Sequence, residues 1–335
     1  MKAWEITDAA GGIDALRLNE RPDPQPGPGE ILVRLGASSL NYRDLLTVTA
    51  PAARGLALPR IPNSDGAGTV SAVGPGVTRF KPGDRVAGCF FQRWDDGEIS
   101  ADGMASALGG ALDGVLAEQA VLAETGAVAV PEGMSDEEAA CLPCAALTAW
   151  NAMVEQGGLK AGDTVLLLGT GGVSIFALQI AAMHGARAII TSSSDAKLER
   201  TRALGAWQTL NYAQTPEWQK AVLEMTDGQG VDQVVEVGGP GTLPRSIEAT
   251  RVAGRIGLIG VLTGGEINPT AIMRKSIHLQ GIYVGSRAMF ERMNRAFAAH
   301  GTRAVIDARF DFDAAREAFH HMRSAGHFGK IVIRM

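Results

Sequence analysis

The feature that most constrains the fold is a glycine-rich turn between an apolar strand and an apolar helix. Residues 165–181 read VLLLGTGGVSIFALQIA. The uncharged run before the turn is typical of a strand that is buried on both faces. Gly169 permits a tight turn, and Gly171 lets backbone N–H groups approach a pyrophosphate at the positive end of the helix. Ser174 stands where such loops usually carry a third glycine, and it is small enough for close packing of the helix on the strand.

This loop predicts the binding of a dinucleotide cofactor. The pattern alone is weak, but here it lies between a predicted strand and a predicted helix, which is the context that dinucleotide binding requires. The alternative is a flexible glycine turn that holds no ligand. The loop residues predicted to bind the cofactor are Gly169, Thr170, Gly171, Gly172, Val173 and Ser174.

Strands and helices alternate on both sides of this loop. Apolar strands are expected at 188–192, 231–237 and 255–261, and a charged helix at 195–204. A further helix is expected at 135–154, because acidic residues follow Ser135 and suit the first turn of a helix. This alternation predicts an α/β fold with a doubly wound parallel sheet.

The first hundred residues are different and predict a mostly antiparallel unit. Short strands at 30–37, 69–73 and 85–87 are separated by turns rich in proline and glycine. The polar and then Gly/Ala-rich stretch 92–114 is expected to be a long surface loop. The final run, 330–334, alternates like a strand and is expected to return to this antiparallel unit.

Composition and charge narrow the class of protein. The chain has 335 residues, of which 46% are hydrophobic and 20% charged, and this suits two globular domains. Acidic residues outnumber basic ones by 36 to 31, which argues against a nucleic acid or an anionic membrane as a partner. Residues 164–186 are uncharged, but the glycine turn divides them into halves too short to span a bilayer. The expected partner is a small-molecule substrate.

The three cysteines, Cys89, Cys141 and Cys144, give no disulfide framework. The N-terminal residues also lack the apolar core of a signal peptide, so a cytoplasmic location is expected. Cys141 and Cys144 form a C-x-x-C pair. This pair is either a redox site or two small buried residues at the start of a helix.

The end of the second strand of the α/β segment indicates which cofactor is used. NAD-binding chains carry an acidic residue there for the ribose 2′-hydroxyl, and Ser192 occupies that position in this chain. Ser192 and Ser193 can donate to a 2′-phosphate, and Lys197 can neutralise it. NADPH is therefore favoured over NADH. Asp195 is the one acid nearby, and it either binds the ribose or caps the following helix.

At this point the chain resembles the medium-chain dehydrogenase/reductase superfamily, over nearly its full length. Within the superfamily it is most similar to the zinc-independent quinone oxidoreductase branch, some of whose members are called alcohol dehydrogenases. The segments that carry the resemblance are SLNYRDLL (39–46), GAGTVSAVGPGVTRFKPGDRV (66–86), CAALTAWNAM (144–153), LLLGTGGVSIFALQIAAMHGARAI (166–189), KLERTRALGA (197–206), GVDQVVEVGG (230–239), GRIGLIGV (254–261) and GKIVI (329–333).

The resemblance implies two domains. A GroES-like, mostly β catalytic domain is expected at 1–122 and 300–335, and a Rossmann dinucleotide-binding domain at 123–299. Members of the family pair an edge strand, here 277–284, with its copy in a second subunit, so a homodimer or homotetramer is expected.

The resemblance also bears on zinc. Zinc-dependent relatives carry Cys and His ligands where this chain has Asn41 and Ser64, and their third ligand matches Cys144. Only Cys144 and Asp65 remain as possible ligands, which is too few for a site that needs three. No zinc is therefore expected.

Other site residues are implied by their match to the family. Asn41 is expected at the nicotinamide end of the cofactor, and Tyr42 is either a hydrogen-bond donor or an aromatic wall of the pocket. Asp65 either orders water or forms a structural ion pair. Thr148 either approaches the nicotinamide carboxamide or is a threonine inside a helix whose hydroxyl bonds to a preceding carbonyl. Tyr212 is expected near the 2′-phosphate, and Lys330 is either near the cleft or on the surface. Loop residues expected against the nicotinamide half are Val237, Gly238, Ile259, Gly260, Val261, Tyr283, Val284 and Gly285.

The activity that these expectations favour is hydride transfer without zinc. With no Lewis acid, the acceptor should be a quinone, an enone or another reactive carbonyl. One alternative is an NAD(P)-dependent alcohol or aldehyde dehydrogenase. The other is a nucleotide-binding protein that has no enzymatic role.

Overall fold

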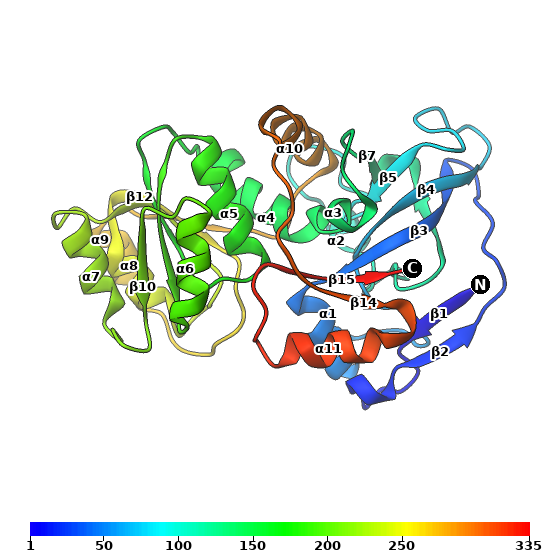
Figure 1. Cartoon of the computed structure of the whole chain (residues 1–335), viewed down its shortest axis with the longest axis horizontal. Coiled ribbons are helices and arrows are strands. Elements are labelled where there is room, and N and C mark those ends of the chain that lie inside the picture. The colour runs from blue at the N-terminus through cyan, green and yellow to red at the C-terminus, as the bar shows by residue number, and fades with distance from the viewer. The chain divides into compact units, whose positions relative to one another are not determined.

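The computed structural model describes residues 1–335 and divides into two compact units. The first unit is Met1–Leu147 together with Gly285–Met335, and the second unit is Thr148–Val284. Figure 1 shows the elements of each unit. The mixed α/β architecture agrees with the predicted fold class.

The second unit is built on a parallel sheet of six strands. Their order is β10–β9–β8–β11–β12–β13, which is the 3-2-1-4-5-6 order of a Rossmann fold. Because the order reverses between β8 and β11, this is the place where such folds bind a ligand, beyond the carboxyl ends of the strands. The bounds are β8 Thr164–Leu167, β9 Arg187–Ser192, β10 Gln208–Asn211, β11 Val231–Glu236, β12 Thr250–Leu258 and β13 His278–Gly281.

Helices cover both faces of this sheet. The strand residues between the helices form an apolar core, as their uncharged sequences predict. Figure 1 shows α5 and α6 on one face and α7 and α8 on the other. The strand residues Leu166, Ile189 and Val234 are buried between the layers. The helix bounds are α5 Gly172–Met183, α6 Asp195–Ala203, α7 Trp218–Met225, α8 Leu243–Ala249 and α9 Pro269–Arg274.

The first unit is mostly antiparallel, as its short strands predict. One sheet has the order β14–β15–β3–β4–β5–β7, with β6 also paired to β3, and β1 pairs with β2 separately. Only β14 and β15 are parallel neighbours. The strand bounds are β1 Lys2–Glu5, β2 Arg17–Glu20, β3 Glu30–Leu40, β4 Asp65–Val73, β5 Arg85–Gly88, β6 Gln119–Ala123, β7 Ala127–Ala129, β14 Ile306–Asp311 and β15 Lys330–Arg334.

The C-terminal strand returns to this unit, as expected. β15 pairs antiparallel with β3, in a register that sets Ile331 opposite Leu40. Lys330 therefore lies beside the end of β3, where helix α1 (Tyr42–Thr49) begins. The other helices of the unit are α2 Ala101–Met104, α3 Asp136–Ala139, α10 Arg287–His300 and α11 Ala315–Arg323.

The predicted helix at 135–154 is more irregular than one continuous α-helix. After α3 the chain forms a π-helical turn at Leu142–Ala146, then α4 (Leu147–Trp150), then a second π-helical turn at Asn151–Glu155. The boundary between the units falls inside α4, at Leu147 and Thr148. π-Helical turns carry no signal in the apolar pattern of a sequence, so this detail was not predictable.

The units do not divide where the expected domains divide, at 122/123 and 299/300. β7 pairs with β5, which keeps the chain beyond residue 123 in the first unit. Asn294 of α10 donates a hydrogen bond from Nδ2 to the carbonyl oxygen of Ala129, at 3.2 Å, which holds α10 to the same unit.

The stretch 92–114 is not wholly a surface loop. Trp94 and Leu108 are buried, and Phe91 packs edge-on against Trp94 with ring centroids 6.0 Å apart. Part of this segment therefore belongs to the core of the first unit. No helix in the structure is both long enough and apolar enough to cross a membrane.

Candidate functional site

The glycine loop of the second unit has open space above it, as a phosphate-binding loop requires. Gly169 has φ +72°, a conformation that favours glycine, and Gly171 is the N-cap of α5. A Cβ atom built on either glycine would meet no atom within 4 Å. α5 is twelve residues long, so its first N–H groups and its dipole present a positive end at this open space.

Ser174 has the packing role expected of it. Its side chain is buried, and its Oγ donates to the carbonyl oxygen of Leu168 at 2.6 Å. This bond satisfies a carbonyl at the end of the strand and keeps α5 close to the sheet. The backbone N–H of Gly169 donates to Oγ1 of Thr191 at 3.2 Å, which joins the glycine loop to the end of β9. The loop residues therefore fit a dinucleotide.

The end of β9 brings together the residues predicted to recognise the 2′-phosphate. Ser192 is buried and ends β9, while Ser193 is exposed. The N–H of Tyr212 donates to the carbonyl oxygen of Ser192 at 3.0 Å, so these two residues are neighbours. Lys197 lies in the first turn of α6. Their contact with a phosphate remains a prediction.

The suggestion that Asp195 caps α6 is wrong. Ser194 is the N-cap, and its Oγ accepts from the N–H of Lys197. The Asp195 carboxylate instead accepts from Nδ2 of Asn211 at 2.7 Å and from Nε2 of Gln214 at 2.9 Å. Both partners lie in or just after β10, a contact that the local pattern of the helix start does not reveal.

Glu236, which the sequence analysis missed, organises the loop after β11. Its side chain is fully buried at the end of this apolar strand. Oε1 accepts from the N–H groups of Gly238 and Gly239, at 2.8 and 3.0 Å, and from Oγ1 of Thr242 at 2.7 Å. Oε2 accepts from Ser246 Oγ. An acidic residue inside an apolar strand, in VDQVVEVGG, was the signal that could have identified it.

This loop is joined to the one that follows β12. Oγ1 of Thr263 donates to the carbonyl oxygen of Gly238 at 2.9 Å and accepts from the N–H of Gly241 at 3.0 Å. A Cβ on Gly260 would overlap the carbonyl oxygen of Val237, so the two loops need glycine at this approach. The structure thus brings together Val237, Gly238, Ile259, Gly260 and Val261 at the carboxyl ends of neighbouring strands, and their contact with the nicotinamide stays a prediction.

The remaining predicted residues of the second unit differ in exposure. Tyr283 is 48% exposed, whereas Val284 is buried and has φ +58°, which is rare for a β-branched residue. Asn151, also missed, donates from Nδ2 to the carbonyl oxygen of Val284 at 2.7 Å and holds this backbone in place. Thr148 is buried and lies in α4.

In the first unit, Lys330 and Asn41 are bonded to each other. Lys330 is only 3% exposed, and its Nζ donates to Oδ1 of Asn41 at 2.6 Å and to the carbonyl oxygen of Leu40 at 2.7 Å. Lys330 is therefore not a surface lysine. Nδ2 of Asn41 is buried, and the Asn41 side chain lies within reach of the Asp65 carboxyl, on which its hydrogen bond acts to lower the pKa.

Two buried carboxylates lie in the same unit. Asp44 accepts from the backbone N–H of Asn41 at 2.8 Å and pairs with Arg43 at 3.1 Å. Asp65 accepts from Oγ of Ser64 at 2.7 Å and from the N–H of Cys144 at 3.0 Å. Asp65 therefore binds the side chain of Ser64 and the backbone of Cys144, two positions where zinc-dependent relatives have ligands.

Burial raises the pKa of Asp65, and the neighbouring charge of Asp44 raises it further. The Lys330 ammonium acts in the opposite direction on this pKa. Burial also raises the pKa of the Cys141 thiol to about 12 and the pKa of Cys144 above its ordinary value. Since a redox pair needs a thiolate, this environment disfavours the redox interpretation of C-x-x-C.

These residues do not fit a catalytic zinc ion. The side chain at position 41 is an amide whose oxygen is bonded to an ammonium, and the hydroxyl of Ser64 is bonded to a carboxylate. The thiol of Cys144 is held in its protonated form by burial. No three His, Cys, Asp or Glu side chains of the chain gather as metal ligands do.

Two further predicted residues lie in the first unit. Tyr42 begins α1 and is 44% exposed, so its phenol is accessible to solvent. Gly285 lies so close to Leu147 that a Cβ there would collide with the leucine side chain. Their roles toward a ligand remain predictions.

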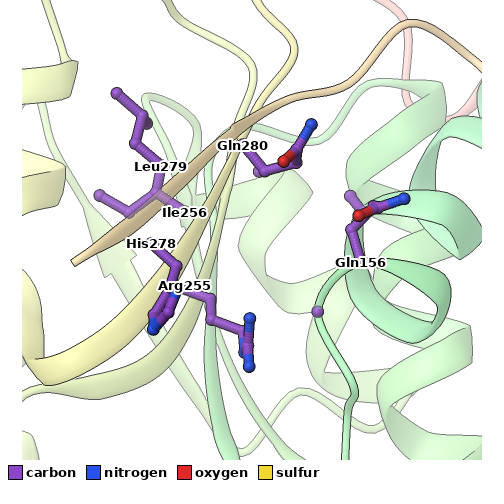
Figure 2. A pocket seen from close by; sticks show the side chains of 9 residues that line it. Gln156, Arg255, Ile256, His278, Leu279 and Gln280 are labelled. Carbon is purple, nitrogen blue, oxygen red and sulfur yellow. The ribbon is translucent and has the colours of Figure 1, made fainter. Parts of the chain in front are cut away.

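A cavity of about 160 Å³ lies elsewhere in the second unit, beside β12 and β13. Figure 2 shows its lining, where Arg255 and His278 are opposite each other in register on the two strands and Gln156 and Gln280 lie further along. None of the predicted site residues lines it.

Comparison with known proteins decides the family. A model described as the alcohol dehydrogenase GroES-like domain matches residues 27–132, and one described as zinc-binding dehydrogenase matches residues 172–299. Together they cover more than half of the chain. The chain belongs to the medium-chain dehydrogenase/reductase superfamily. It is thus an NAD(P)H-dependent oxidoreductase, which sets aside the non-enzymatic alternative.

Three superfamily relatives illustrate this similarity. A zinc-type alcohol dehydrogenase-like protein of Schizosaccharomyces pombe is 42% identical to this chain, and the match covers 99% of each of the two chains. A quinone oxidoreductase of Pseudomonas aeruginosa is 34% identical over 76% of this chain and 72% of its own. The crystal structure of a putative alcohol dehydrogenase from Sinorhizobium meliloti 1021 is 43% identical, covers 100% of this chain and 98% of its own, and has a TM-score of 0.93.

Proposed function

We propose that this dehydrogenase/reductase works without zinc and uses NADPH to reduce a quinone, an enone or another reactive carbonyl. The observation that carries the proposal is the hydrogen bond from Lys330 Nζ to Asn41 Oδ1 at 2.6 Å. It puts a fixed monovalent cation on the side chain that replaces a metal-binding thiolate in zinc-dependent relatives. When bound, the reduced nicotinamide supplies a hydride, and the acceptor gains this hydride and one proton in a two-electron reduction.

The residues of the first unit supply hydrogen-bond donors rather than a Lewis acid. Neutral donors stabilise a developing oxyanion less than a divalent metal ion does, so they suit an acceptor that is already electrophilic. The Asn41 amide N–H groups and the Tyr42 hydroxyl are the donors of this unit that we assign to the reaction. Tyr42 is accessible to solvent, and we assign it the proton that the reduced acceptor takes up.

The preference for NADPH rests on the end of β9. Ser192 ends the strand where an acid would bind the ribose of NAD, and Tyr212 is bonded to it through the backbone. The one nearby acid, Asp195, has its carboxylate engaged by Asn211 and Gln214. Lys197, in the first turn of α6, supplies the positive charge that a 2′-phosphate requires.

The test is a comparison of initial rates with four substrate classes. A 1,4-quinone, an α,β-unsaturated ketone and an aldehyde are assayed with NADPH and with NADH, and a primary alcohol with NADP⁺ and NAD⁺, each with and without EDTA. We expect reduction of the quinone or the enone with NADPH, unaffected by EDTA. Alcohol oxidation that EDTA abolishes would instead support the alcohol dehydrogenase activity that the names of two relatives suggest.

We further infer that two copies of the chain associate along β13. This strand is at the edge of the six-stranded sheet, where one side of its backbone has no neighbour. Large apolar side chains of the adjoining segments are exposed, with Val261, which follows β12, at 69% and Met273 of α9, which precedes β13, at 67%. A second copy would cover both features, and a tetramer requires a further interface.

A further inference from the structure

The cavity beside β12 and β13 is lined by polar side chains that the proposed reaction does not use. Arg255 of β12 and His278 of β13 are opposite each other in the parallel register, so both project from the same face of the sheet. Ile256 and Leu279, the next residue of each strand, pack in the apolar core on the other face. Figure 2 shows these two side chains directed away from Arg255 and His278.

The second π-helical turn and the two residues after it form the other wall of the cavity. The turn approaches the sheet closely because Gly257 has no side chain, and a Cβ there would lie 3.0 Å from the Cβ of Ala152. Nε2 of the buried Gln233 donates to the carbonyl oxygen of Gly157 at 2.9 Å and fixes the end of this wall. The space between the walls, about 160 Å³, is much larger than the volume of one water molecule, about 30 Å³ in the liquid.

The basic groups of this cavity have no counter-charge. Arg255 and His278 are its basic lining residues, and no Asp or Glu lines it. Neither side chain makes a hydrogen bond, an ion pair or a ring contact with the rest of the chain. Both residues are exposed, so a ligand can reach them. Since like charges directly opposite each other on neighbouring strands destabilise a sheet, this pair calls for an anion.

The other two arginines on strands of the same sheet do have partners. Arg251, four residues before Arg255 on β12, donates from Nε to the carboxylate of Asp232 at 2.6 Å. The guanidinium of Arg187 on β9 lies 4.5 Å from the centre of the Trp207 ring. Arg255 is therefore the exception, and it is the one of the three that lines a cavity.

We propose that this cavity binds a phosphate group, with Arg255 as the main ligand and His278 and Gln156 as further donors. A guanidinium offers its N–H groups in a planar fork that matches two phosphate oxygens. An imidazole donates from at least one ring nitrogen, and the carboxamide of Gln156 makes no bond within the chain. Because the donors come from two strands and from the facing turn, they suit a tetrahedral phosphate better than a planar carboxylate. The ligand is inorganic phosphate or a small phosphorylated compound.

This site is separate from the cofactor site and from the surface proposed for association. The cofactor is expected beyond the carboxyl ends of the strands, whereas the cavity lies on a face of β12 and β13 before those ends. Association along β13 would use backbone groups in the plane of the sheet, while His278 projects from its face. Phosphate binding is therefore compatible with both, and it does not depend on the proposed function.

The experiment is a calorimetric titration of inorganic phosphate into protein saturated with its nicotinamide cofactor, so that the phosphate positions of the cofactor are already filled. We expect one phosphate bound per chain. Arg255→Gln should raise the Kd for phosphate about tenfold or more, because a charge-assisted contact is lost. Arg255→Lys keeps the charge without the fork and should raise the Kd less. A wild type that binds no phosphate, or an unchanged Kd in Arg255→Gln, would overturn the inference.

Arg274→Gln is the matched control. Arg274 is an exposed residue of α9 in the same unit, it makes no side-chain bond, and it does not line the cavity. Its replacement removes the same charge and should leave the Kd unchanged, whereas a rise equal to that of Arg255→Gln would contradict a specific site. His278→Ala should also raise the Kd, and it decides the question if Arg255→Gln does not fold. An unchanged Kd in that variant would then overturn the inference.

Competition identifies the source of the phosphate group. Glycerol phosphate, a phosphate monoester, should displace inorganic phosphate from the cavity. If the monoester binds more tightly, a phosphorylated compound is supported as the ligand, and if inorganic phosphate binds more tightly, the free ion is supported. Malonate tests the other class of oxyanion. If malonate binds more tightly than both phosphates and loses affinity in Arg255→Gln, the assignment to phosphate is wrong.

Discussion

The carboxylate of Glu236 accepts a hydrogen bond from the backbone N–H of Gly238 at 2.8 Å, within a loop that follows a buried strand. Three other donors complete the set, those of Gly239, Thr242 and Ser246. A buried carboxylate that is satisfied by four donors has a fixed position, and it fixes the backbone that supplies two of them. Glu236 therefore fixes the shape of the loop after β11, which is predicted to face the nicotinamide.

Replacing Glu236 should damage both folding and cofactor binding. Glu236→Ala leaves buried donors unpaired and should lower the free energy of unfolding by about 3 kcal/mol, whereas Glu236→Gln should cost about 1 kcal/mol. Both variants should raise the Kd for NADPH, because the loop loses its fixed shape. Urea unfolding and fluorescence titration measure the two effects. Glu266→Ala, an exposed residue of the neighbouring loop, is the control, and an unchanged Kd in Glu236→Ala would refute the positioning role.

The choice of cofactor should change with the charge at the end of β9. Lys197→Ala should weaken NADPH binding by about 10- to 100-fold, which corresponds to about 1.4–2.8 kcal/mol, and should leave NADH binding nearly unchanged. Ser192→Asp should reverse the preference, since an acid there attracts the ribose hydroxyls and repels the phosphate.

The ratio of the two dissociation constants is the measurement that decides this. Arg202→Ala is a matched control, because it removes the same charge from the last turn of the same helix. Equal losses for NADPH and NADH in Lys197→Ala would show that this lysine does not contact the 2′-phosphate.

How much the sequence predicts depends on the range of the interactions. The glycine loop, Ser174 and the alternation of strands and helices are local patterns, and their predicted places agree with the structure to within a few residues. The bond between Lys330 and Asn41 depends on the register of β15 against β3, which no local pattern reveals. The same holds for Asp195, whose partners come from the next strand. Glu236 is intermediate, because its position in an apolar strand was a signal that could have been used.

The ionisation of Asp65 should make stability depend on pH in an unusual direction. Burial, followed by the charge of Asp44, raises the pKa of this carboxyl in the folded state. The folded protein then holds the proton when the unfolded chain has lost it, so this group lowers stability as the pH rises above about 4, the ordinary pKa of Asp. Asp65→Asn removes this contribution.

Urea unfolding of wild type and Asp65→Asn between pH 4.5 and 8 isolates the effect, because all other titrating groups are shared. The free energy of unfolding of the variant should improve relative to wild type as the pH rises. A difference that stays constant, or that shifts in favour of wild type, would show that the folded carboxyl has no raised pKa.

Association along β13 can be tested with one backbone hydrogen bond donor. The N–H of Ile282 donates to the carbonyl oxygen of Leu258, so the N–H of the preceding residue, Gly281, points away from β12. Gly281→Pro removes that outward donor and should yield monomers in light scattering. Gly281→Ala keeps the donor and meets no neighbouring atom within 4 Å, so it should remain associated. Monomeric wild type, or an associated proline variant, would exclude this interface.

The absence of zinc is the prediction with the sharpest chemical test. Purified protein should contain well under one zinc per chain, and EDTA should leave quinone reduction unchanged. The physical reason is that the ammonium of Lys330 is bonded to the side chain at position 41, where zinc-dependent relatives place a thiolate. An ammonium and a divalent cation repel each other at such distances, and a buried pair is poorly screened.

This reason predicts how a zinc site could be restored. Asn41→Cys with Ser64→His provides two ligands to join Cys144, the three that a catalytic site needs. With Lys330 still present, zinc should bind weakly, and adding Lys330→Met should raise the affinity about tenfold or more, or about 1.4 kcal/mol. Competition with a chromophoric chelator measures the affinity, and Lys275→Met in the same background controls for the loss of a lysine elsewhere. If zinc binds equally well with and without Lys330, its ammonium is not what keeps the metal out.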